Sequence, residues 1–243
     1  MPHTARKISA SGYYHVVSKG LANQILFDND DHRRLYLSYL RDAKVENHLR
    51  LHAYCLMSNH VHLIVEDEHE KIADAMKYVD ERYAMYYAQE TGRTGGLFRK
   101  PYWSEPIEDD ARLLYAVRYV HNNPAAAGLC RASQYEWSSV KDYLGTRQGG
   151  ITDTSTVLDI LGGVRGFILF SRSDSATALP FSDSKLRNHL DDTEVLRLAT
   201  DIIGHDPRTN STKDEIRVLK ERGFPHLQIA RITGWSKSQI ARA

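Results

Sequence analysis

The sequence contains only two cysteines, Cys55 and Cys130, among its 243 residues. They lie too far apart to form a zinc motif built from closely spaced cysteine pairs, so we expect two reduced thiols. A phosphate-binding glycine loop of the GxxxxGK(S/T) type is also absent from the sequence. This loop binds the phosphates of ATP or GTP, so its absence is consistent with a protein that does not use ATP.

Long apolar runs are missing as well. No apolar stretch approaches membrane-spanning length, and none follows the N-terminal residues as it would in a secretory leader. Hydrophobic residues make up 42% of the chain and charged residues 26%, which is typical of a globular protein rather than a disordered one. We therefore expect a cytoplasmic protein without a membrane partner.

Acidic residues are scarce in one part of the chain. Residues 210–243 hold 7 Lys and Arg against 3 Asp and Glu, whereas residues 1–149 hold 19 of each kind. A basic end on a neutral body suggests a polyanionic partner that binds locally.

The hydrophobic pattern predicts an α+β fold. We expect strands at 13–18, 52–57, 60–66 and 97–103, and helices from a cap cluster at 29–31 to about 46, at 72–89 and at 109–122. The third helix should end before Pro124, because the residue preceding a proline disfavours helical geometry. The order β-α-β-β-α-β predicts a ferredoxin-like split βαβ domain with an antiparallel sheet. We place this domain at 1–148, a connector with short helices at 149–209, and a helical unit at 210–243.

Two histidines alternate along the second strand of the predicted hairpin. His60 and His62 flank one hydrophobic residue, so their side chains should point to the same face. Two neutral imidazoles on one face supply half of a divalent-metal site. A hydrogen-bonded or solvent-exposed histidine pair is the plainer alternative.

The third predicted helix carries Tyr115, Tyr119 and Asn123 at four-residue spacing, which places them along one stripe. This stripe borders an apolar face, so Tyr119 could reach a site while the core holds its ring. The amide of Asn123 could complete a ligand set with the two histidines. A lone helical tyrosine is more often a core residue, and an asparagine before a proline is often a helix-end cap.

Four segments together resemble the REP-associated tyrosine transposases, part of the single-tyrosine HUH endonuclease superfamily. They are Gly12–Val16, Ala53–Val65, Arg118–Leu129 and Tyr135–Ser139. The resemblance covers roughly the first 145 residues, and the hairpin and helix motifs together make it specific.

The resemblance implies that His60 and His62 bind a divalent metal, Mg²⁺ or Mn²⁺, and that Tyr119 is the nucleophile. Asn123 would be the third ligand, although some relatives have glutamine there. Tyr115 is a rival nucleophile that matches the family pattern less well. The implied substrate is single-stranded or hairpin DNA, which would be cleaved and rejoined through a 5′-phosphotyrosine intermediate.

Basic and aromatic residues mix around the fourth predicted strand. Arg99 and Lys100 could follow phosphates, and Tyr102 and Trp103 could stack on unpaired bases. A solvated strand edge beside a buried tryptophan explains them equally well. In the N-terminal arm, Arg6 and Lys7 could add DNA contacts.

The C-terminal unit has the spacing of a helix-turn-helix at Ala230, Gly234 and Ile240, with helices expected at 212–222, from 225, and from a Ser236 cap. That motif places its last helix in the major groove of DNA. The candidate DNA contacts are Lys237, Ser238, Gln239 and Arg242. A small helical packing module remains the alternative.

Two other functions remain open at this point. One is a non-catalytic DNA-binding regulator on the same fold, and the other is a metal-dependent phosphodiesterase that uses water as its nucleophile. The sequence also leaves open whether the protein is a monomer or a homodimer.

Overall fold

The computed structural model describes residues 7–172, 196, 199–200, 203–221 and 226–242. The chain divides into two compact units, one made of residues 1–126 and 130–176, the other of residues 127–129 and 177–243. No described helix is both long and apolar enough to span a membrane.

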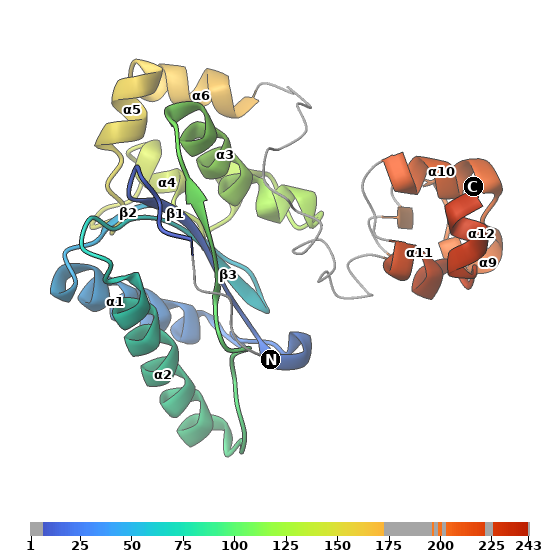
Figure 1. The fold of residues 1–243 in the computed structure, drawn as a ribbon, viewed down its shortest axis with the longest axis horizontal. Coiled ribbons are helices and arrows are strands. Elements are labelled where there is room, and N and C mark those ends of the chain that lie inside the picture. The colour runs from blue at the N-terminus through green and yellow to red at the C-terminus, as the bar shows by residue number, and fades with distance from the viewer. Residues whose placement is uncertain (1–6, 173–195, 197–198, 201–202, 222–225, 243) are drawn as a thin grey trace. The chain divides into compact units, whose positions relative to one another are not determined.

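The N-terminal unit has the predicted β-α-β-β-α-β order (Figure 1). Its main elements are β1 (Tyr13–Lys19), α1 (Asp30–Glu46), β2 (Arg50–Leu56), β3 (His60–Glu66), α2 (Ile72–Thr91), β4 (Trp103–Ile107) and α3 (Asp110–Ala126). The shorter helices α4 (Val140–Tyr143), α5 (Ser155–Leu161) and α6 (Val164–Arg172) follow, and single 3₁₀ turns lie at Leu21–Asn23 and Ala132–Gln134.

The four strands form one antiparallel sheet in the order β2-β3-β1-β4. This arrangement confirms the predicted α+β class and the split βαβ topology. In the figure, α1 and α2 lie on one side of the sheet and α3 on the other (Figure 1). Strand β1 pairs with both β3 and β4, so its residues sit at the centre of the sheet.

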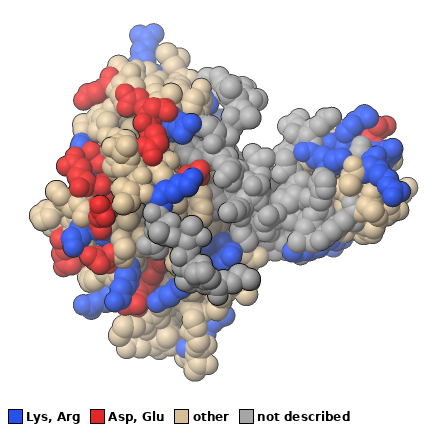
Figure 2. Space-filling view, in the orientation of Figure 1, with Lys and Arg blue, Asp and Glu red and all other residues tan. Residues whose placement is uncertain are grey.

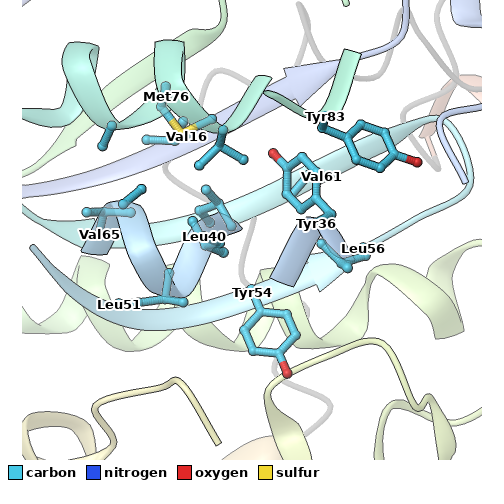
Figure 3. Packing of buried hydrophobic residues seen from close by; sticks show 14 of the residues in the cluster. Val16, Tyr36, Leu40, Leu51, Tyr54, Leu56, Val61, Val65, Met76 and Tyr83 are labelled. Carbon is cyan, nitrogen blue, oxygen red and sulfur yellow. The ribbon is translucent and has the colours of Figure 1, made fainter. Parts of the chain in front are cut away.

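The main core fills the space between the sheet and the pair α1 and α2 (Figure 3). This core includes Val16 of β1, Val61 of β3, Tyr36 of α1 and Tyr83 of α2, and each of these four side chains is fully buried. Burial of such side chains stabilises the fold by roughly 1.5–3 kcal/mol each, which anchors the sheet whose opposite face carries the site.

The fourth strand begins later than predicted. Residues 97–102 follow the end of β1 through single contacts, such as the hydrogen bond from Arg99 N to Lys19 O at 2.7 Å, and only β4 pairs regularly with β1. Pro101 lacks an amide proton and cannot donate to a β-ladder, so the regular strand starts beyond it.

The third helix continues past Pro124, so the predicted end at residue 122 is wrong. Pro124 cannot donate its amide to the carbonyl of Val120, one turn earlier. The side-chain amide of Asn123 donates instead, to Val120 O at 3.5 Å and to Tyr119 O at 2.9 Å. A side chain thus replaces the missing backbone donor, which allows the helix to reach Ala126.

A segment after α3 ties this helix to the free edge of β2. Ser139 donates its amide to Tyr54 O at 3.0 Å, and its hydroxyl accepts from Tyr54 N at 2.9 Å. The same hydroxyl lies 2.7 Å from Nε2 of His121 on α3. His121 also contacts the rings of Tyr143 and Phe167, so α4 and α6 pack here as well. By their contacts, α5 and α6 therefore belong to the same compact unit as the sheet.

The C-terminal unit contains α9 (Pro207–Asn210), α10 (Lys213–Glu221), α11 (His226–Thr233) and α12 (Lys237–Arg242). The last three correspond to the three predicted helices. Its small core comprises Ala199, Ile216, Leu219, Ile229, Ile232 and Ile240. Gly234, between α11 and α12, has a φ of +74°, a conformation that glycine adopts without strain. The assignment of α11 and α12 as a DNA-reading helix-turn-helix stays a prediction.

Candidate active site

The candidate site lies on the face of the sheet that α3 covers. In the β1–β3 register, His60 is opposite Lys19 and His62 is opposite Val17. Alternation along the two strands therefore brings Lys19, His60 and His62 to one face, together with His15, four positions before Lys19 on β1. The sheet supplies the site with three imidazoles and one ammonium group.

His62 lies at the centre of this group and is 2% exposed. Burial and, to a smaller extent, the positive charge of Lys19 lower its pKa to about 3, although a hydrogen bond with Asn123 opposes the shift. The ring is therefore neutral near pH 7, as a metal ligand must be. Its Nδ1 lies 3.0 Å from Nε2 of His15, so Nε2 is the ring nitrogen that could bind a ligand.

His60 is half-buried, and its ring centroid lies 4.8 Å from that of His62. Its Nδ1 forms a hydrogen bond with the side-chain oxygen of Asn59 at 2.6 Å. An amide oxygen can only accept, so Nδ1 carries the proton and Nε2 carries the lone pair. Asn59, in the turn before β3, thus orients the ring of His60. Metal-binding histidines usually have a hydrogen-bond partner of this kind on the nitrogen that does not bind the metal.

Tyr119 on α3 faces the histidines. Its ring centroid lies 5.6 Å from that of His62 and 5.7 Å from that of His15, both edge to face. The rival Tyr115 packs elsewhere, with Phe170 of α6 at 6.2 Å and the guanidinium of Arg118 at 5.0 Å. The structure therefore brings Tyr119, and not Tyr115, to the histidine pair.

Asn123 lies one turn beyond Tyr119 and forms hydrogen bonds with both the helix backbone and His62. Its side-chain nitrogen donates to the helix backbone at Tyr119 and Val120, as a helix-end residue does. Its side chain also forms a hydrogen bond with His62. Asn123 therefore lies beside the histidine pair, with its nitrogen held by the helix.

The sequence analysis missed two residues of this group, His15 and Lys19. Both are buried, and His15 contacts His62 directly. Burial, together with the charge of His62, lowers the pKa of His15 well below its usual value. The alternation of β1 could have placed both residues on one face, but only the pairing of β1 with β3 selects that face as the one that carries His60 and His62.

Three of the four predicted DNA-contact residues of the N-terminal unit lie within the described residues, and all three are at its surface. Arg6 falls outside the described residues, while Lys7, Arg99 and Lys100 are exposed. Lys100 also pairs with Glu81 at 3.2 Å. Trp103 is half-buried and its ring meets that of His15 at 5.3 Å, so β4 brings an aromatic surface to the site.

The C-terminal candidates all lie on α12. Ser238, Gln239 and Arg242 are exposed, and Lys237 lies in the first turn, where its side chain is not described. Gln239 takes part in a capping box: Ser236 N donates to its side-chain oxygen at 3.0 Å, and Gln239 N donates to the Ser236 hydroxyl at 3.3 Å. On the face shown in Figure 2, Lys and Arg of this unit outnumber Asp and Glu, whereas the N-terminal unit mixes both signs.

Within the described ranges, no group of three or more His, Cys, Asp or Glu side chains is arranged to hold a metal ion. The predicted ligands are the imidazoles of His60 and His62 and the amide of Asn123. They do not form such a group, because asparagine is not one of these four residue types. Both imidazoles have a defined partner at Nδ1, and His62 is kept neutral by burial. Two imidazoles and an amide are donors that could bind a divalent cation and leave coordination positions for other ligands.

The family model described as "Transposase IS200 like" matches residues 9–123. A solved structure of a REP-associated tyrosine transposase bound to a REP hairpin is similar at 13% identity and a TM-score of 0.51, over 63% of this chain and 94% of that one. A crystal structure from Deinococcus radiodurans R1, described as a candidate transposase, gives 21% identity and a TM-score of 0.34, over 50% and 97%. No curated protein matches the chain.

Proposed function

We propose that this chain belongs to the IS200-like transposase family, whose model matches residues 9–123, and that it cleaves and rejoins single-stranded DNA with Tyr119 as the nucleophile. The observation that carries the proposal is the approach of Tyr119 to His62 across the interface between α3 and the sheet, with ring centroids 5.6 Å apart. The other tyrosine of the same stripe packs against α6.

A divalent cation would be held by His60, His62 and Asn123. Such a cation, when bound, polarises the scissile phosphate and stabilises charge on its non-bridging oxygens. The donor chemistry supports this assignment, because both histidines are oriented at Nδ1 by fixed partners and Asn123 hydrogen-bonds the ring of His62. The imidazoles favour Mn²⁺ by affinity, whereas Mg²⁺ is the more available ion.

In the proposed reaction, the phenolic oxygen of Tyr119 attacks the phosphorus atom and the bond from phosphorus to the 3′-oxygen breaks. The phenol gives up its proton and the departing 3′-oxygen takes one up, so a 5′-phosphotyrosine and a 3′-hydroxyl result. Attack by a 3′-hydroxyl on the phosphotyrosine reverses these steps and rejoins a strand, which requires no ATP.

Within this scheme, the packing of α3 positions the nucleophile. A phenol in water has a pKa of about 10, so a tyrosine nucleophile in general needs help to lose its proton near neutral pH. The ammonium of Lys19, on the same face of the sheet as His60 and His62, adds positive charge that favours a phenolate and a bound phosphate.

The proposed substrate is single-stranded DNA near a hairpin. The solved REP-associated transposase that shares this fold is described with a bound hairpin, which supports that choice for this chain. Exposed Lys7 and Arg99 would contact phosphates, and Trp103 beside the site would stack on an unpaired base. The basic face of the C-terminal unit would add duplex contacts.

The test is a covalent-adduct assay with labelled single-stranded hairpin DNA and Mg²⁺ or Mn²⁺. We expect wild type and Tyr115→Phe to form an adduct that survives denaturing electrophoresis, and Tyr119→Phe to form none. Chelation with EDTA should also abolish the adduct.

Two outcomes would support the rival functions. Tight binding of DNA by wild type without any adduct would favour a non-catalytic regulator. Metal-dependent cleavage that persists in Tyr119→Phe would favour a phosphodiesterase that uses water as its nucleophile.

A further inference from the structure

His15 and His62 face each other from neighbouring strands, and both are buried. His15 Nε2 lies 3.0 Å from His62 Nδ1, and the two rings stack with centroids 5.2 Å apart. A hydrogen bond forms only when one of these nitrogens carries a proton and the other offers a lone pair. The pair therefore has two arrangements, which differ in the ring that donates.

We propose that His15 is a positioning residue that holds His62 in the one tautomer able to bind a divalent cation, an inference that rests on the proposed function. In this tautomer, Nδ1 of His62 donates to Nε2 of His15, and the lone pair of His62 lies on its Nε2. In the opposite arrangement His15 donates, so the ring proton of neutral His62 occupies Nε2 and blocks metal binding.

The packing around His15 holds its ring in place. Its strand, β1, is paired on both sides, with Ile64 of β3 and Glu105 of β4 opposite His15. Its ring also meets the edges of the rings of Trp103 at 5.3 Å and Tyr119 at 5.7 Å. The position of the His15 ring is therefore fixed by a strand paired on both sides and by the rings of Trp103 and Tyr119.

A histidine in this position also differs from the carboxylate that often supports a metal-binding histidine. A neutral imidazole accepts the hydrogen bond without adding negative charge beside the cation. The full positive charge then remains available to the phosphate, which matters because the substrate is a polyanion. The site would gain ligand orientation without weakening its attraction for DNA.

Two variants separate hydrogen-bond acceptance from packing. The side-chain oxygen of glutamine can reach roughly the place of Nε2, so His15→Gln should retain most of the affinity for Mn²⁺. His15→Leu fills the space but cannot accept, and we expect its Mn²⁺ dissociation constant to rise roughly 10–100-fold. His32→Leu is the matched control, because His32 is also buried but lies on α1, where it bonds Glu90. Its Mn²⁺ affinity should equal that of wild type.

A second measurement uses the wild-type protein and does not depend on activity or on the folding of a variant. Nitrogen NMR of ¹⁵N-histidine-labelled protein with Mg²⁺ distinguishes the two neutral tautomers of each ring. We expect His62 to carry its proton on Nδ1 when Mg²⁺ is bound. Electron paramagnetic resonance of free Mn²⁺ provides the dissociation constants of the variants.

The outcomes distinguish this inference from the proposed function. A folded His15→Leu protein that binds Mn²⁺ as tightly as wild type would overturn the role of His15, and so would a Mg²⁺-bound His62 protonated at Nε2. If wild type shows no Mn²⁺ binding that depends on His60, as judged by comparison with His60→Ala, both the role of His15 and the proposed metal-dependent strand transfer fail. If metal binding depends on His15 as expected but no adduct with Tyr119 forms, strand transfer fails and the role of His15 stands.

Discussion

Replacement of Asp80 by asparagine should remove a pH-dependent cost to the stability of the N-terminal unit. Asp80 on α2 is 7% exposed and accepts hydrogen bonds from the hydroxyls of Ser18 at 2.7 Å and Tyr36 at 3.4 Å. Burial raises its pKa from 3.8 to about 7, although both hydrogen bonds oppose the rise. The folded protein therefore binds this proton more tightly than the unfolded chain does.

The sign of the effect follows from linkage between proton binding and folding. A carboxyl whose pKa is raised by folding contributes stability that is fully present below about pH 4 and is lost as the pH rises through 7. The interval from 3.8 to about 7 corresponds to ~4 kcal/mol of unfolding free energy. Asparagine has almost the same shape and carries no charge, so Asp80→Asn should avoid this loss.

Urea unfolding of wild type and Asp80→Asn across this range measures the effect. Buried His15, His62 and His121 have lowered pKa values and act in the opposite direction, since their contribution is lost as the pH falls. They affect both proteins equally, so the difference between the two isolates Asp80. We expect this difference to move in favour of the variant by about 1 kcal/mol for each pH unit between about 5 and 7.

A difference that stays constant with pH would refute this account of Asp80. The control is Asp74→Asn, because Asp74 lies on the same helix with its side chain 66% exposed. Its difference from wild type should stay nearly constant between about pH 5 and 7.

Three further predictions concern the anchoring of α3, the cap of α12 and the charge in the site. Ser139→Ala should cost about 1–3 kcal/mol in urea unfolding, because it leaves buried His121 without its hydroxyl partner, and an unchanged midpoint would contradict this. Ser236→Ala should cost α12 about 1 kcal/mol through loss of the capping box, seen as faster amide hydrogen exchange in that helix, whereas Lys213→Ala should leave that exchange unchanged. Lys19→Met should slow adduct formation roughly tenfold or more at saturating DNA, and a wild-type rate would exclude an electrostatic role for Lys19.

Local rules account for the parts of the site that lie within one element. Alternation along a strand places His60 and His62 on one face, because successive side chains point to opposite sides of a sheet. Helical spacing places Tyr115, Tyr119 and Asn123 along one stripe for the same kind of reason. Both patterns follow from the regular backbone geometry of a single strand or helix. They can therefore be predicted without knowing which other element packs against it.

Local rules failed where a distant or unexpected group intervened. Pro124 should have ended α3, but the side chain of Asn123 supplies the donor that the backbone lacks. The fourth strand begins at Trp103 and not at residue 97 as predicted. β-Propensity alone does not show that regular pairing with β1 starts only after Pro101.

The choice between the two tyrosines of the stripe depended on tertiary packing. His121 bonds Ser139 at the edge of β2, and Tyr115 packs against Phe170 of α6, so α3 docks with Tyr119 over the histidines. Likewise, His15 meets His62 only because β1 pairs with β3 in one particular register. The sequence by itself determined which side chains share a face of one strand or helix, since a repeating backbone imposes that order. Which faces meet was decided by long-range contacts between segments more than forty residues apart, and no local repeat contains that information.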